Sequence, residues 1–112
     1  MTRVKLASVR TFPHVAPNKA QALKPLEEAA EVFGAWQEVA RCRSNGLCGR
    51  ECSCVDDCGA VENCIDVHNM LDEIADTIQA SCNLAAALGV TDLTPYLARC
   101  EERNRHRGRY DE

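Results

Sequence analysis

The chain has 112 residues, which is about the size of one domain. Its net charge of -4 disfavours a general nucleic-acid binder, because affinity for the phosphate backbone requires an excess of Lys and Arg. No apolar run approaches the roughly 20 residues that cross a bilayer, and Arg10, Pro13 and His14 interrupt any signal-peptide core. We therefore expect one cytoplasmic domain over residues 1–112, with neither a membrane nor a nucleic-acid polymer as partner.

The first 17 residues show no helical or strand periodicity and read as an arm with two prolines. Helix propensity rises from Asn18, a candidate N-cap. Pro25 then suits the first turn of a helix that runs to about Arg41, since an earlier start would leave a kink at Pro25. The apolar side of this helix consists of Leu26, Ala29, Ala30, Val32, Phe33 and Trp36.

Residues 43–60 contain glycines, an Asn-Gly pair and no periodic apolar face, so we predict a loop there. Helical spacing returns over 61–88, and Gly89 suits the C-terminal cap. The apolar stripe of this second helix is formed by Leu71, Ile74, Ala75, Ile78, Cys82, Ala85 and Leu88.

Thr94 and Pro95 open a third helix, with the Thr94 hydroxyl as its N-cap, and Gly108 ends it. No strand is evident. The sequence therefore predicts an all-α fold, an antiparallel helical bundle whose long central hairpin joins two helices through a Cys-rich loop at 42–64.

Eight cysteines in so short a chain favour a secreted disulfide scaffold, but six of them lie within 42–64 instead of stapling distant segments. Their spacing, Cys-x5-Cys-x3-Cys-x-Cys-x3-Cys-x5-Cys, is nearly symmetric, and thiolates suit Zn²⁺. The Cys-x2-Cys pairs typical of zinc sites are absent, so structural zinc, reduced thiols and disulfides all remain open. The candidate zinc ligands are Cys48, Cys52, Cys54 and Cys58.

Two pairs of acids have the same spacing on the first two helices. Glu28 and Glu31 lie three residues apart, and so do Glu73 and Asp76. On a helix this separation is about 60°, so both carboxylates of a pair can converge on one cation. Four carboxylates between two helices repel one another unless cations neutralise them, and carboxylate oxygens suit Mg²⁺ or Mn²⁺.

Glu-rich helix surfaces are usually solvated and paired with Lys or Arg, and one such pair would carry little weight. Here the spacing is repeated on consecutive helices, and neither 26–32 nor 71–78 contains a basic residue. The repetition favours a metal site.

The chain resembles the MazG-type all-α nucleoside triphosphate pyrophosphohydrolases, which are related to dimeric dUTPases and dCTP pyrophosphatases. The resemblance rests on Leu-Glu-Glu-Ala-Ala-Glu-Val at 26–32, Asp-Glu-Ile-Ala-Asp-Thr-Ile at 72–78, Leu-Gly-Val-Thr-Asp-Leu at 88–93 and Glu-Arg-Asn-Arg-His-Arg-Gly-Arg-Tyr at 102–110. In their order, these stretches cover most of residues 18–110.

The resemblance implies conversion of a (deoxy)nucleoside triphosphate to its monophosphate and pyrophosphate, by a homodimer or homotetramer. It assigns Mg²⁺ to Glu28, Glu31, Glu73 and Asp76, with Glu27 as an auxiliary ligand or water-orienting base. This chain departs from the family at Cys100, where relatives usually have a Lys, and in the length of the Cys-rich loop. Arg99 or Arg103 is the candidate replacement for the Lys.

Substrate contacts are predicted at the end of the third helix and on the first. Asn104, Arg107 and Arg109 offer donors for triphosphate oxygens, although a solvated basic tail is equally consistent for each Arg. Trp36 could stack a base, as could Phe33, but core packing is the commoner role. Asn18 and His14 resemble an arm that closes over the base in relatives.

The leading hypothesis is therefore a magnesium-dependent pyrophosphohydrolase. Two rivals stay open: a zinc-stabilised interaction module without catalysis, and a secreted disulfide-stapled domain. Release of pyrophosphate separates the first from both, while thiol titration and metal analysis separate the other two. The preferred base is not evident from the sequence.

Overall fold

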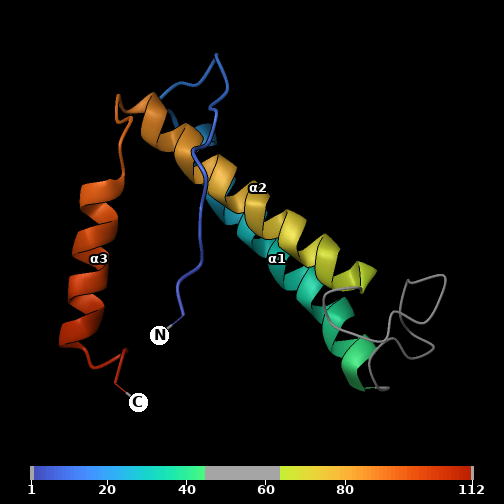
Figure 1. The fold of residues 1–112 in the computed structure, drawn as a ribbon. Coiled ribbons are helices and arrows are strands. Elements are labelled where there is room, and N and C mark those ends of the chain that lie inside the picture. Colours follow the sequence, from blue (N-terminus) through green and yellow to red (C-terminus); the bar gives the residue numbers. More distant parts are fainter. Residues whose placement is uncertain (1, 45–63, 112) are drawn as a thin grey trace.

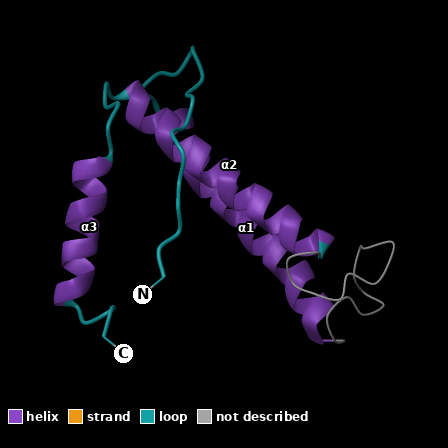
Figure 2. Ribbon diagram, in the orientation of Figure 1, coloured by secondary structure: helices purple, strands orange, loops and turns teal. Residues whose placement is uncertain are grey.

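The computed structural model describes residues 2–44 and 64–111, the side chains of 42–44 excepted, and these residues form three α-helices and no strand. The helices are α1 (Lys19–Ser44), α2 (Ile65–Ala87) and α3 (Thr94–His106). α1 and α2 pack as a hairpin, whereas α3 stands apart from it (Figure 1). The predicted all-α class and central hairpin are confirmed. The 2–18 arm has no regular structure (Figure 2).

α1 begins where its cap is strongest. Asn18 Oδ1 accepts a hydrogen bond from the Gln21 backbone N–H at 2.9 Å, so Asn18 is the N-cap that the sequence indicates. The helix therefore starts at Lys19 and Pro25 lies inside it, and the prediction that Pro25 occupies the first turn is wrong. Because Pro25 has no N–H, the Gln21 carbonyl loses its usual partner four residues on, and the Asn18 cap offsets that loss.

Both predicted glycine stops are confirmed. Gly89 has φ +82° after α2, and Gly108 has φ +71° after α3. At the end of α2, Gly89 N–H donates to Ala86 O at 2.9 Å and Val90 N–H donates to Ala85 O at 2.9 Å, which is a Schellman motif. This motif satisfies carbonyls that the helix end would otherwise leave unpaired.

The predicted hydroxyl cap of α3 is wrong. Thr94 is the first residue of α3, and the N-cap position is Leu93, which makes no side-chain cap. Instead, Asp92 Oδ1 accepts a hydrogen bond from the Thr94 N–H at 2.9 Å. The Asp92 carboxylate lies at the positive end of the helix dipole, where a negative charge is stabilising. It takes the capping role expected of the Thr94 hydroxyl.

The seam between α1 and α2 follows a repeat of three and four residues. On α1 the buried and half-buried positions include Gln21, Pro25, Glu28, Val32, Ala35 and Val39. On α2 they include Met70, Glu73, Thr77, Ala80, Leu84 and Ala87. This is the spacing of helices that pack nearly antiparallel, and it places one glutamate of each helix in the seam.

The predicted apolar sides of both helices are largely exposed in this protomer. Leu26 is 68% exposed, Phe33 62% and Leu71 51%. The seam contains polar residues and alanines together with Val32, Val39, Met70 and Leu84, while Leu26, Phe33 and Leu71 lie outside it. The buried apolar residues of the described chain are Val39, Cys64, Val67 and Ala80.

The described protomer is extended. Its radius of gyration is 17.2 Å, whereas a compact domain of this length has about 13 Å. α3 has no buried residue, and it packs on neither α1 nor α2 in the part of the chain that the structure describes. None of the described helices is long and apolar enough to cross a membrane.

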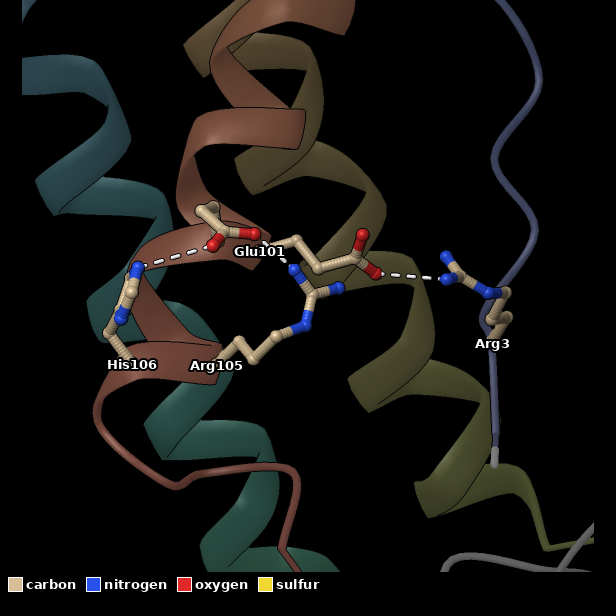
Figure 3. A network of polar contacts seen from close by, with 5 residues as sticks. Arg3, Glu101, Arg105 and His106 are labelled. Carbon is tan, nitrogen blue, oxygen red and sulfur yellow. Dashed lines mark hydrogen bonds and ion pairs between the residues drawn. The ribbon is translucent and has the colours of Figure 1, made fainter.

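A surface ion pair links the arm to α3. Arg3 Nη2 lies 3.0 Å from Glu101 Oε1, and on the same helix Glu102 pairs with Arg105 and with His106 (Figure 3). Arg3 is mostly exposed, and exposed pairs of this kind contribute little to stability. The pair is therefore a weak tether for α3.

Two of the described glycines, Gly34 and Gly89, give a matched test of the Schellman stop. A Cβ at Gly89 or at Gly34 of α1 would meet nothing within 4 Å, but only Gly89 has positive φ. Gly89→Ala should lower the free energy of unfolding by about 1–2 kcal/mol, because alanine is strained there. Gly34→Ala should raise it by about 0.5–1 kcal/mol. Thermal unfolding followed by circular dichroism checks both, and equal effects would contradict the assigned stop.

Candidate functional site

Three glutamates from α1 and α2 converge at the seam. One carboxylate oxygen from each of Glu28, Glu31 and Glu73 lies within 4.8 Å of the other two. Two ligands of one Mg²⁺ are separated by at most about 4.2 Å, so small side-chain rotations would bring all three onto one ion. Glu28 and Glu73 are half-buried, while Glu31 is exposed.

Asp76 lies beside this triad and not within it. Its charge raises the pKa of both Glu28 and Glu73, and it lines a cavity together with Glu28. The structure therefore brings all four members of the predicted quartet to one place, with Asp76 at its cavity side. Glu27 instead pairs with Lys24 at 3.2 Å on the exposed surface of α1.

The crowding of acids changes their protonation. The pKa of Glu28 is raised chiefly by a hydrogen bond with Glu31, then by desolvation and the charges of Glu31 and Asp76, while Lys24 lowers it. The pKa of Glu73 is raised by the same kinds of cause, led by its hydrogen bond with Glu31. A hydrogen bond between two carboxyl groups requires a shared proton. A cation at the cluster would compete with protons for these carboxylates.

One atom of the cluster has no partner at all among the described residues. Glu73 Oε2 is buried and accepts no hydrogen bond there. Burying an unpaired carboxylate oxygen is costly, and a cation would satisfy it. Together with a donor set of hard carboxylate oxygens, this orphaned atom fits Mg²⁺ or Mn²⁺.

A cavity of about 530 Å³ opens beside the cluster. It lies between the arm, the first half of α1 and the second half of α2, and it is lined by Phe12, His14, Ala16, Asn18, Ala20, Gln21, Lys24, Glu28, Asp76, Gln79, Ala80 and Asn83. This volume falls within the range of small-molecule sites. A ligand in the cavity would place one end against Glu28 and Asp76.

The predicted substrate residues are distributed unevenly around this cavity. Asn18 and His14 line it. Trp36 does not: it is 44% exposed, lies about two turns beyond Glu28 along α1 and is absent from the cavity lining. Phe33 likewise is exposed and absent from the cavity lining.

The residues predicted to bind phosphate belong to α3 and its end. Asn104 Nδ2 donates to Cys100 Sγ at 3.6 Å, while Arg107 and Arg109 are exposed after the helix. Arg99, a candidate replacement for the missing Lys, lies over the Tyr96 ring at 5.6 Å. Since α3 packs on neither hairpin helix, these residues are not brought to the glutamate cluster within the described protomer.

The predicted zinc ligands Cys48, Cys52, Cys54 and Cys58 lie outside the described residues, as does most of the 42–64 loop. Among the described cysteines no disulfide is formed, and Cys64 is buried at the N-cap of α2.

Sequence reasoning missed Phe12, Lys24, Gln79 and Asn83 as cavity residues. Gln79 and Asn83 were detectable in part, because they are polar residues four apart near the apolar stripe of α2, and Asn83 follows Asp76 by seven residues. Phe12 gave no such indication, since an arm without periodicity does not reveal which side it presents.

The raised pKa values predict how the metal-free protein responds to pH. The folded hairpin binds protons more tightly than the unfolded chain, whose Glu titrates near the ordinary value of 4.5. Stability present below this value is therefore lost as pH rises through the raised pKa values. Glu73→Gln should remove much of this loss, so in EDTA its melting temperature should exceed that of the wild type increasingly as the pH rises above about 4.5.

Glu38→Gln is the matched control, because Glu38 lies on α1 outside the cluster and pairs with Arg41. It should show no gain at neutral pH. A Glu73→Gln protein that melts below the wild type throughout this pH series would contradict the repulsion inferred for the cluster.

Comparison with protein-family models, with curated proteins and with solved structures gave no match to this chain. The functional argument therefore rests on the site's own residues: a glutamate triad with Asp76 beside it, an orphaned carboxylate oxygen, and a cavity of about 530 Å³ that shares Glu28 and Asp76 with the cluster.

Proposed function

We propose that this protein is a Mg²⁺-dependent nucleoside triphosphate pyrophosphohydrolase that converts a (deoxy)nucleoside triphosphate to the monophosphate and pyrophosphate. The observation that carries the proposal is the position of the glutamate cluster at the edge of a nucleoside-sized cavity. The MazG-like order of acidic motifs supports the same reaction class. Mn²⁺ is an alternative cation.

The roles of the residues follow from this arrangement. Glu28, Glu31, Glu73 and Asp76 would hold the cation, which supplies charge neutralisation of phosphate oxygens and activation of a water molecule. The α1–α2 seam keeps the two pairs of acids next to each other. Glu27, held at 3.2 Å by Lys24, is the candidate to orient the water or accept its proton.

The reaction is a hydrolysis at the α-phosphorus. The oxygen of water forms a bond to this phosphorus, and the bond from it to the α,β-bridging oxygen breaks. Pyrophosphate leaves with that oxygen, and the proton of the water passes to a carboxylate and then to solvent. The alternative on the same site is stepwise removal of the terminal phosphate, which yields a diphosphate and orthophosphate.

Substitution of the acids tests the assignment. Glu31→Gln and Asp76→Asn should each lower turnover by more than about a hundredfold, because loss of a direct ligand exceeds the effect of its supporting partners. Both variants should remain helical by circular dichroism and should bind Mn²⁺ more weakly by calorimetry. The control Glu38→Gln should keep both activity and Mn²⁺ affinity. Retained activity in both Glu31→Gln and Asp76→Asn would contradict the proposal.

Turnover in ¹⁸O-labelled water locates the bond that breaks. Label should enter the nucleoside monophosphate and not the pyrophosphate. Label in pyrophosphate would move attack to the β-phosphorus, and orthophosphate as the first product would refute the reaction class. A screen of common and deoxy triphosphates with this assay also identifies the base that the protein prefers.

The working form is a homodimer or homotetramer under this proposal. Outward apolar residues on both hairpin helices, such as Leu26, Phe33 and Leu71, form faces that a second copy would cover. Since α3 does not reach the cluster in its own protomer, we expect α3 of a second copy to bring Asn104, Arg107 and Arg109 to the triphosphate.

Light scattering at micromolar concentration should therefore report an oligomer, and a monomer would contradict this part of the proposal. Mixing two inactive variants tests the shared site. Glu31→Gln alters the hairpin and Asn104→Ala alters α3, so a randomly mixed dimer should regain about a quarter of the wild-type activity. No recovery, with exchange of subunits verified, would place both residues in the site of one chain.

A further inference from the structure

The arm is fastened to α2 by two neighbouring amide side chains. Asn83 is 3% exposed, and its Oδ1 accepts hydrogen bonds from the Phe12 backbone N–H at 3.1 Å and from Gln79 Nε2 at 3.0 Å. Gln79 Nε2 also donates to the Arg10 carbonyl at 2.9 Å. These three bonds hold Arg10 and Phe12 against α2, so the arm becomes one wall of the cavity.

The same bonds determine which way the Asn83 amide points. The Phe12 N–H can only donate, so the atom beside it must be Oδ1. Two donors occupy the two lone pairs of Oδ1, and Asn83 can accept nothing more. Its Nδ2 donates to no described residue, although Asn83 lines the cavity. The Nδ2 donor is not among the buried unpaired atoms of the described residues, so it is open to the cavity and free to donate to a ligand there.

Asn83 lies at the opposite end of the cavity from the acids. It follows Asp76 by seven residues, so both occupy the same face of α2, about 10 Å apart along the helix axis. A nucleoside can bridge this span with its phosphate at Asp76 and the far edge of its base at Asn83. The exocyclic group of the base would then meet the unpaired donor.

We infer that Asn83 is a specificity-determining residue that selects a base with a carbonyl group at this edge over one with an amino group. The inference rests on the proposed function and deepens it by naming the class of base. An amino group would oppose the Nδ2 donor with a second donor and leave both without an acceptor. Gln79 is the positioning residue. Its Nε2 donates both to Asn83 Oδ1 and to the Arg10 carbonyl, so it fixes the orientation of the Asn83 amide and the position of the arm.

Binding of non-hydrolysable α,β-imido triphosphates in Mg²⁺ tests the selection by calorimetry. Two pairs of probes differ by an oxo or amino group and the adjoining ring nitrogen: the analogues of dUTP and dCTP, and those of dITP and dATP. In at least one pair the wild type should prefer the oxo member by about tenfold or more. This ratio requires no variant, so it remains decisive even if substitutions unfold the protein.

The substitution Asn83→Asp replaces the free Nδ2 donor with a carboxylate oxygen, which is an acceptor. One carboxylate oxygen can still accept from Phe12 and Gln79, while the other now accepts where Nδ2 donated. The added charge weakens every triphosphate alike, so the oxo-to-amino ratio is the measured quantity, and it should fall below one. A wild-type ratio near one in both pairs, or an unchanged ratio in the variant, would overturn the inference. Wild-type binding of no probe would instead overturn the proposed function together with it.

Amide hydrogen exchange tests the fastening of the arm without any nucleotide. Asn83→Ala should raise exchange in residues 9–15 because the Phe12 N–H loses its acceptor, whereas Asn83→Asp should retain protection. Gln37→Ala, an exposed substitution on α1, is the matched control and should change nothing there. Equal exchange in all of these proteins would refute the role of Asn83 in holding the arm.

Discussion

Like-charge repulsion within a helix–helix seam is the constraint on which the rest of this structure depends. Glu28 and Glu73 occupy positions of the seam repeat where a hairpin ordinarily buries apolar side chains, and Glu31 brings a third carboxylate within 4.8 Å of both. Only a shared proton or a cation offsets such crowding, and the crowding raises the pKa of both Glu28 and Glu73. The repulsion within the metal-free hairpin is therefore the same interaction that a bound cation would relieve, because metal binding is coupled to folding.

The polar seam has a second consequence for the outer surface of the hairpin. Glu28 and Glu73 occupy positions in the seam, while Leu26, Phe33 and Leu71 remain exposed outside it. The two helices thus carry glutamates within a seam that also buries Val39 and Ala80, and they leave several large apolar side chains on the outside. The described protomer is extended, and its α3 packs on neither α1 nor α2.

The arm converts an open groove beside the acids into a cavity with two unlike ends. Its backbone is anchored by Gln79 and Asn83 and not by regular structure, so the wall depends on a few directional hydrogen bonds. One end of the cavity carries the carboxylates of Glu28 and Asp76, and the other carries an amide donor. A ligand that fits must therefore be polar at both ends, with an anionic group matched through a cation at one end and an acceptor at the other.

The sequence by itself determined the local features: the all-α class, the Asn18 cap, the stops at Gly89 and Gly108, and the pairing of acids three residues apart on two helices. Each of these depends on contacts within about one helical turn, which residue type and spacing are sufficient to specify. The tertiary structure alone decided that Glu28 and Glu73 lie in the seam while the large apolar residues lie outside, because periodicity identifies the faces of a helix but not the partner of each face. It also decided that Trp36 lies away from the cavity and that Phe12 and Asn83, 71 residues apart, meet at its wall. Contacts at such separation depend on how the whole chain packs, so no local pattern encodes them.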